Sequence, residues 1–283
     1  MKPGDIALLA CPRCRGALAF QGHTRDGRLA EGRLHCSGCA TAWPVVAGLP
    51  RLFQEREVRG TDRLMRVIYD GLPSLHDPLT WLLTPVLQGI TEAQMRQGYM
   101  PRLELDTLAP PAGGRPLRLL EVGIGAGANL PLVTRALPPG LEVELWGVDL
   151  SEGMLRQCQR RLEREGPAGV RLLMADAHAL PFPDHFFDRV FEIGGLNGYR
   201  EPRRALAEMA RVARPGTPLV VVDEQLDAKA RSLKDRLAFR LITFYTRDAH
   251  SPRQLLPEGA EGILEEQISR FYFCLTFRMP PAR

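Results

Sequence analysis

Four cysteines near the N-terminus have the spacing of a metal site. Cys11 and Cys14 form one Cys-x2-Cys pair, and Cys36 and Cys39 form a second pair after a spacer of 21 residues. Two such pairs on tight turns can supply four thiolates to one tetrahedral zinc ion, and this closed shell leaves no position for a substrate. We therefore predict one structural Zn2+. His35 adjoins Cys36 but is not expected to bind the metal, because four thiolates already complete the shell.

The sequence around these cysteines resembles the small zinc-ribbon domains of the Trm112-like type. The resemblance covers about residues 6–53 and includes the apolar text from Trp43 to Leu52. In such proteins the domain is an adaptor that is often associated with methyltransferases. That association is implied by the resemblance and not by the cysteine spacing.

A glycine-rich segment in the second half of the chain has the character of a ligand-binding turn. Gly123, Gly125 and Gly127 follow an apolar run over 117–122 and precede an expected helix over 128–137. Glycines let the backbone approach a ligand closely, and the start of a helix presents unpaired N–H groups. In an open α/β sheet, the crevice at these strand ends is the expected ligand site.

Acidic residues at the strand ends help to distinguish between two kinds of ligand for the glycine-rich turn. Taken alone, the glycines and Ala128 also satisfy the Gly-x-Gly-x-x-Ala fingerprint of a dinucleotide site, and Asp149 suits a ribose hydroxyl in either case. Glu121 precedes the first glycine, and a second acid, Asp176, follows the third expected strand. A dinucleotide fold does not require this series, whereas a compact adenosine ligand with an amino-acid tail uses one acid for the ribose and another near the adenine.

These motifs together resemble a class I S-adenosylmethionine-dependent methyltransferase with a small-molecule, quinone-methyltransferase-like core. The matching segments are residues 119–127, 147–151, 175–183 and 205–216. The resemblance covers about residues 115–225 and a terminal strand over 271–277. It implies an α/β fold, a Rossmann-like, doubly wound, mostly parallel seven-stranded sheet. It also implies S-adenosyl-L-methionine as the cofactor and S-adenosyl-L-homocysteine as the product.

The same resemblance implies which residues contact the cofactor. The backbone of Gly123–Gly127 would face its methionine part, Asp149 would accept the ribose hydroxyls, and Asp176 with the Ala177 backbone would contact the adenine. Similar proteins cover the cofactor with a helical segment carrying a tyrosine, here Tyr69. The expected cofactor-binding residues are Glu121, Gly123, Gly125, Gly127, Asn129, Asp149, Leu150, Asp176, Ala177 and Tyr69.

No catalytic base can be assigned from the sequence. Methyl transfer from a sulfonium is an in-line displacement, and a base is needed only for an unactivated acceptor. Related small-molecule enzymes often have a histidine in the segment after the fourth strand, where this chain has Asn197, and the Asn-Pro-Pro-Tyr tetrapeptide is absent. The catalytic candidates are Tyr69, His76, Glu192, Asn197 and Tyr199. His178 and His185 are expected in surface loops.

Alternating strands and helices must position these residues. Strands are expected over 117–122, 143–148, 170–174, 188–193 and 217–222, and helices over 128–137, 151–165, 202–213 and 227–245. This alternation predicts a mostly parallel sheet covered on both faces, ending in an antiparallel hairpin near Ile263. The helix over 227–245 carries an apolar stripe that includes Leu233, Leu237 and Leu241. It is expected to be either a solvated helix with a basic face or a lid whose stripe faces an apolar substrate.

Three regions follow from these motifs. Residues 1–53 are expected to form the zinc ribbon, residues 54–114 a helical cover and linker, and residues 115–283 the methyltransferase domain, with a helical insertion near 227–260. Residues 1–59 contain 9 basic and 5 acidic residues and so carry the whole net charge of +4. The remainder is neutral, which makes a polyanionic substrate less favoured than the total charge suggests.

Composition limits the remaining classes. Apolar residues make up 45% and charged residues 25% of the 283 residues, which is typical of globular proteins and argues against disorder. The longest uncharged apolar-rich run, over 78–91, is shorter than the roughly 20 residues that a membrane span requires, and no signal peptide is recognised. A cytoplasmic location is therefore expected, where paired cysteines hold metal rather than form disulfides.

We expect an S-adenosylmethionine-dependent methyltransferase that acts on a small, partly apolar molecule. Two alternatives stay open. One is an rRNA or tRNA base methyltransferase whose basic zinc ribbon grips RNA, although the chain has no arginine-rich run. The other is a non-catalytic cofactor-binding module that docks a protein partner. The sequence does not indicate the acceptor atom or the oligomeric state.

Overall fold

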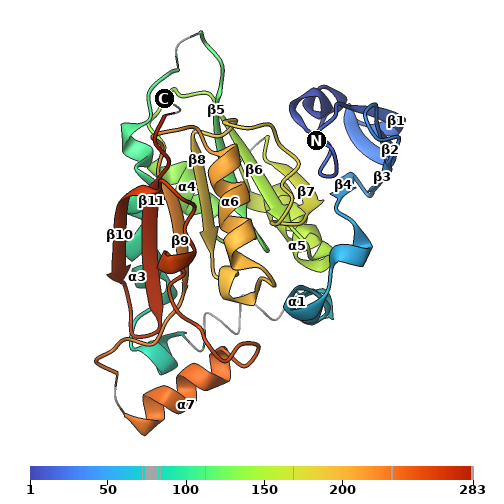
Figure 1. Cartoon of the computed structure of the whole chain (residues 1–283). Helices are drawn as coiled ribbons and strands as arrows, with labels where there is room; N and C mark the ends of the chain where they lie inside the picture. The colour runs from blue at the N-terminus through green and yellow to red at the C-terminus, as the bar shows by residue number, and fades with distance from the viewer. Residues whose placement is uncertain are drawn as a thin grey trace.

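A computed structural model describes residues 1–71, 73, 82, 84–111, 113–167, 169–230 and 232–281. Its centre is an 11-stranded sheet in the order β1-β2-β3-β4-β7-β6-β5-β8-β9-β11-β10 (Figure 1). The strands are β1 (Leu18–Arg25), β2 (Arg28–Cys36), β3 (Ala42–Val46), β4 (Leu49–Leu52), β5 (Leu117–Val122), β6 (Val143–Asp149), β7 (Arg171–Ala175), β8 (Arg189–Ile193), β9 (Leu219–Glu224), β10 (Glu261–Gln267) and β11 (Tyr272–Arg278).

The central strands run parallel, as the alternating pattern predicts. β6, β7 and β8 are each joined in parallel to a neighbour, and β9 pairs in parallel with β8. Every residue of β9 is buried, which fits a strand covered on both faces and explains its unbroken valine run. β11 is antiparallel to both β9 and β10, so the predicted terminal hairpin is confirmed.

Helices connect and cover these strands. The α-helices are α1 (Gly60–Gly71), α3 (Glu92–Tyr99), α4 (Leu130–Ala136), α5 (Glu152–Glu165), α6 (Pro202–Val212) and α7 (Leu233–Ile242). Short 3-10 helices are η1 (Pro3–Leu8), η2 (Glu55–Glu57), η3 (Met100–Leu103), η4 (Leu105–Thr107), η5 (Leu196–Gly198) and η6 (Arg253–Leu255). No described helix is long and apolar enough to cross a membrane.

The ends of the helices follow local capping chemistry. The Ser151 side chain accepts from the N–H of Met154, so α5 begins close to the expected position. The expected helix over 227–245 is shorter in the structure, where α7 starts only after Ser232. The reason is a local turn, because the Asp227 side chain accepts from the N–H of Lys229 and competes with helical pairing.

Two apolar clusters cover the two faces of the sheet. On one face Leu206 and Met209 of α6 pack with sheet residues such as Trp146. On the other face Tyr99 of α3 and Leu155 of α5 pack among residues of β5 and β6. Figure 1 shows α6 in front of the strands and α3 behind them. The sheet is therefore a three-layer arrangement whose strand ends stay accessible.

The cysteine-rich N-terminal part joins this sheet instead of standing apart. β4 pairs in parallel with β7, with Arg51 opposite Met174 and Leu52 opposite Ala175. Its buried residues Leu34 and Trp43 belong to the same apolar cluster as Trp146. Figure 1 shows the N-terminal strands beside β7. The N-terminal strands thus share a core with the central sheet, and β4 directly supports the strand that precedes Asp176.

Candidate functional site

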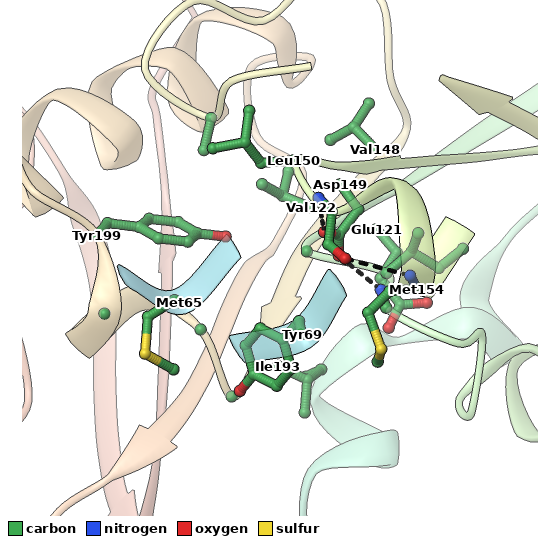
Figure 2. Close-up of a pocket in the computed structure, with 18 of the residues that line it drawn as sticks. Met65, Tyr69, Glu121, Val122, Val148, Asp149, Leu150, Met154, Ile193 and Tyr199 are labelled. Atoms are coloured by element: carbon green, nitrogen blue, oxygen red, sulfur yellow. Dashed lines mark hydrogen bonds between the residues drawn. The ribbon is translucent and has the colours of Figure 1, made fainter. Parts of the chain in front are cut away.

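A cavity of about 1170 Å3, counting the solvent at its mouth, opens at the carboxyl ends of β5, β6 and β7. Figure 2 shows Asp149 and Glu121 on one side and the side chains of Met65 and Tyr69, both from α1, on another. Among the sequence-predicted cofactor residues, the cavity is lined by Tyr69, Glu121, Gly123, Gly125, Asn129, Asp149, Leu150, Asp176 and Ala177. The structure therefore brings together predicted residues from four separate segments of the chain.

Asp149 holds the glycine turn in place. Its Oδ2 accepts from the N–H of Gly125 at 2.8 Å, and its Oδ1 accepts from the N–H of Ser151 at 2.8 Å. Burial raises the pKa of this carboxyl, and these backbone hydrogen bonds oppose that rise. Each oxygen keeps a further lone pair, so the carboxylate can accept additional hydrogen bonds from a ligand in the cavity.

Steric constraints explain why glycine occupies two positions of this turn. Gly123 has φ +69°, and a Cβ there would lie 3.0 Å from the Tyr199 hydroxyl. Gly127 has φ +75°, and its Cβ would meet the Cys158 Sγ at 2.7 Å. Gly127 is not among the residues that line the cavity, so it shapes the turn by packing against α5.

Glu121 lies at the base of the turn in a chain of hydrogen bonds. Asn129 Nδ2 donates to Glu121 Oε1 at 2.5 Å, and the Tyr99 hydroxyl donates to Asn129 Oδ1 at 2.6 Å. Arg96 also donates to Asn129 Oδ1. Burial raises the pKa of Glu121 to about 7. Glu121 thus positions Asn129 at the start of α4.

Folding stability should depend on pH through Glu121. Its pKa rises from 4.5 to about 7 on folding, so the unfolded chain loses this proton in a range where the folded chain keeps it. The contribution of Glu121 to the free energy of unfolding is therefore fully present below pH 4.5, and it is lost as the pH rises toward and through 7. Glu121→Gln should remove this loss and stabilise the protein by at most about 3 kcal/mol above pH 7.

Urea unfolding between pH 5 and 8 measures this effect. Glu192 and Asp223, whose pKa values burial also raises, remain in the variant and keep part of the pH dependence. Glu261→Gln, at an exposed position, is the matched control and should behave like the wild type. Equal pH dependence in Glu121→Gln and the wild type would show that Glu121 keeps an ordinary pKa in the folded chain.

Asp176 is joined to the cover helix through Arg200. Its Oδ2 accepts from Arg200 Nη2 at 3.0 Å, and Arg200 also pairs with Asp62 of α1. Its Oδ1 lies 2.5 Å from His178 Nδ1. Since His178 Nε2 accepts from the N–H of Glu201, Nδ1 carries the proton and donates to Asp176. Burial opposes ionisation of Asp176, but the His178 and Arg200 contacts hold its pKa at about 2.

The placement of His178 corrects one expectation. His178 is 2% exposed and forms part of this network, so it is not a surface-loop residue, whereas His185 is exposed as expected. The loop after β7 turns inward because Asp176 accepts from the backbone N–H of His178 at 2.9 Å. The sequence offers no signal for this network, because Asp62, Arg200 and Asp176 come from three distant segments.

Three tyrosine side chains form another part of the cavity wall. Figure 2 shows the Tyr199 ring pointing toward Val122 and Asp149, with Tyr69 from α1 on a neighbouring side. Tyr245 also lines the cavity, and its hydroxyl donates to Glu224 Oε2 at 2.7 Å. Burial raises the pKa of Tyr199, and nearby acids reinforce that rise. These hydroxyls therefore stay protonated near neutral pH and act as hydrogen-bond donors.

Two other catalytic candidates that the structure describes, Glu192 and Asn197, do not line the cavity. Glu192 is fully buried, and among the described residues neither of its carboxyl oxygens has a hydrogen-bond partner. Burial raises its pKa well above the ordinary value. Asn197 is tied to β9, since its backbone N–H donates to Asp223 and its Nδ2 donates to the Glu224 carbonyl. His76 lies outside the described residues.

The four N-terminal cysteines gather at one point. All four sulfur atoms lie within 4.8 Å of one another, with Cys11 Sγ 3.8 Å from Cys39 Sγ and Cys14 Sγ 3.4 Å from Cys36 Sγ. A zinc ion with Zn–S distances of about 2.3 Å requires tetrahedral edges of about 3.8 Å, so this spacing fits the ion. The residue after each pair has a positive φ, so both turns have the same local form: they are Arg15 (φ 61°) and Ala40 (φ 54°).

Comparisons with known proteins agree with the geometry of the cavity. Residues 120–221 match the family described as "Methyltransferase domain". This segment contains the glycine turn, Asp149 and Asp176. It covers about a third of the chain and does not include the N-terminal cysteines.

Curated relatives include two quinone-pathway enzymes and a phospholipid enzyme. The chain is 39% identical over 166 residues to the ubiquinone/menaquinone biosynthesis C-methyltransferase UbiE of Bordetella avium (strain 197N). The matched segment covers 58% of this chain and 58% of the relative. It is 38% identical over 107 residues to a phosphatidylethanolamine N-methyltransferase of Cereibacter sphaeroides, covering 38% of this chain and 50% of the relative. It is 41% identical over 108 residues to a demethylmenaquinone methyltransferase of Thermus thermophilus, covering 38% and 47%. The chain thus spans about half the length of these relatives.

A solved structure shows that the fold itself is shared. The [4+2]-cyclase SpnF superposes with a TM-score of 0.52 and 19% identity, covering 79% of this chain and 98% of the cyclase. The fold is the Rossmann-like methyltransferase fold, so the predicted fold class is confirmed. A fold that also carries a cyclase does not by itself fix the reaction.

Proposed function

We propose that this chain, which carries a class I S-adenosylmethionine-dependent methyltransferase domain, methylates a small, partly apolar molecule. One observation carries the proposal: a single cavity combines a glycine turn and Asp149 with a wall built by Met65, Tyr69 and Tyr199. The first set suits a polar adenosyl ligand, and the second set suits an apolar acceptor. The names of the curated relatives support the same class, because they refer to quinones and to a phospholipid.

In this proposal, three groups of residues contact three parts of the cofactor. The backbone at Gly123 and Gly125 would border the methionine part, and the free lone pairs of Asp149 would accept the ribose hydroxyls. Ala177 and Asp176 border the adenine. Asp176 already accepts from His178 and Arg200, so it acts mainly by fixing the shape of that end of the cavity.

Positioning supplies most of the catalysis in this proposal. Bound S-adenosylmethionine would supply an electrophilic methyl group, and the cavity walls would hold the acceptor in line with it. Tyr69 and Tyr199 line the cavity as hydrogen-bond donors and not as bases, since burial raises both pKa values. This arrangement favours an acceptor that is already nucleophilic, such as an amine or a carbon activated by a neighbouring hydroxyl.

We also propose that the four cysteines bind one structural zinc ion. Cys11, Cys14, Cys36 and Cys39 supply four sulfur ligands, so no coordination position is left for a substrate. The Gly38 N–H donates to Cys36 Sγ at 3.3 Å, a contact that stabilises a thiolate. The ion would hold the N-terminal strands together, where a segment of about 50 residues buries little apolar surface alone.

The two alternative functions receive less support. RNA binding would use basic side chains on the N-terminal part, and two of the nine there are engaged in ion pairs, Arg15 with Asp184 and Arg51 with Glu152. None of the curated relatives described above is named as an RNA enzyme. A non-catalytic module would bind the cofactor without turnover, a case that the SpnF fold makes worth testing.

Methyl transfer from labelled S-adenosylmethionine tests the proposal. The purified chain is incubated with lipid extract, total RNA or protein from the source cells. The label should enter the solvent-extractable lipid fraction, and Asp149→Asn should strongly reduce this transfer at low cofactor concentration. Label confined to RNA or protein would replace the proposed substrate class, and cofactor binding without any transfer would favour the non-catalytic module.

A further inference from the structure

Large apolar side chains that face solvent are concentrated in three helical segments of the described structure. Of the nine that are exposed, eight lie on α1, on the segment before α3, or on and just after α7. These eight are Leu64, Val67, Leu82, Val86, Leu233, Leu237, Leu241 and Phe244, and the ninth is Leu264 of β10. Scattered exposed leucines are ordinary, but a concentration in the cover segments indicates an interaction surface.

The apolar stripe of α7 points away from the protein. Leu233, Leu237, Leu241 and Phe244 are 72%, 63%, 68% and 60% exposed. The opposite side of the helix is attached to the body, since Phe239 is buried with its ring 5.7 Å from that of Phe271. Figure 1 shows α7 at the edge of the molecule, beyond the sheet. The stripe therefore does not face the cavity, and the expectation of a lid with an inward apolar face is wrong for this arrangement.

Basic side chains border this stripe on both sides. With 3.6 residues per turn, Lys234 lies at one edge of the stripe, and Arg236 and Arg240 lie at the other. All three are exposed. The acidic residue of the helix, Asp235, lies on the attached side, where it pairs with Arg270 at 3.0 Å. The solvent-facing side of α7 is thus apolar along its centre and positive along its edges.

We propose that α7 docks on the surface of a lipid bilayer that contains anionic lipids. A helix with an apolar stripe flanked by Lys and Arg lies in the interface plane, with its apolar side chains among the acyl chains and its basic groups at the phosphates. The charge pattern selects this occupant over a second copy of the chain, because two such faces would bring like charges together.

The docking surface is continuous in sequence with the cavity wall. Tyr245 lines the cavity immediately after the exposed Phe244. On α1, Met65 and Tyr69 line the cavity, whereas Leu64 and Val67 face solvent. Docking would therefore place the cavity close to the bilayer, where an apolar molecule could enter without crossing water. The docking itself does not depend on methyl transfer.

Vesicle flotation of the full chain tests this inference. The protein should float with vesicles of phosphatidylcholine and phosphatidylglycerol and should bind vesicles of phosphatidylcholine alone much more weakly. Leu237→Asp combined with Leu241→Asp should lower binding by about tenfold or more, because two buried apolar contacts are lost. Arg236→Glu with Arg240→Glu should lower binding only to the anionic vesicles.

Leu264→Asp is the matched control, since Leu264 is also exposed but lies on β10. It should bind vesicles like the wild type, and circular dichroism with thermal unfolding should show that each variant is folded. The inference is overturned if the wild type binds neither vesicle, or if the α7 variants bind as the wild type does. It is also overturned if sedimentation shows a wild-type dimer that Leu237→Asp with Leu241→Asp abolishes while vesicle binding is absent.

Discussion

Asp149→Asn is expected to weaken the binding of S-adenosylmethionine by about 30-fold to 1000-fold, or roughly 2–4 kcal/mol. In the structure both carboxyl oxygens of Asp149 already accept from backbone N–H groups, of Gly125 and of Ser151. An asparagine has one acceptor oxygen, so its NH2 group would face one of these donors. The substitution thus loosens the glycine turn and also removes acceptors for the ribose hydroxyls.

Isothermal titration calorimetry of the wild type and Asp149→Asn measures this effect. Asp248→Asn is the matched control, because the Asp248 side chain is 89% exposed and does not line the cavity. Burial raises the pKa of Asp149, so a neutral side chain relieves a cost of burial and the ligand-free variant should remain folded. Unchanged affinity in a folded Asp149→Asn would place the ribose elsewhere.

The central sheet could be predicted because its signals are local. The apolar runs from Leu117 and from Leu219 are long enough to define buried strands, and the glycines after Val122 mark the turn between strand and helix. Because parallel strands place their carboxyl ends at one edge, acids after successive strands are brought together by topology alone. The resemblance to class I methyltransferases implies that Asp149 and Asp176 face one ligand, and both line the cavity.

Contacts between distant segments could not be predicted in the same way. No periodic pattern connects Asp62 of α1 with Arg200, which is 138 residues away, yet the two form an ion pair beside Asp176. Glu192 is likewise buried near the end of β8, where its carboxyl group lies close to Gly195. The cavity wall formed by α1 and Tyr245 is a product of tertiary packing, for which a single sequence contains no local signal.

The proposed zinc site is expected to control the stability of more than the N-terminal strands. Cys36→Ser should abolish zinc binding and lower the free energy of unfolding by several kcal/mol, since structural zinc contributes on the order of 10 kcal/mol to small domains. Leu34 and Trp43 pack with Trp146, and β4 pairs with β7. Loss of the metal should therefore weaken the sheet edge beside Asp176, and not only the cysteine-rich turns.

Metal analysis and calorimetry together test this expectation. The wild type should contain about one zinc per chain and should unfold in a single transition, because the N-terminal strands and the central sheet share one apolar cluster. Cys274→Ser is the matched control, since Cys274 is also buried but lies in β11 and outside the cysteine cluster. It should keep its zinc. A wild type free of zinc would refute the site. If Cys36→Ser instead unfolds in two steps, with a new transition at low temperature and an unchanged main transition, the N-terminal strands fold independently of the sheet.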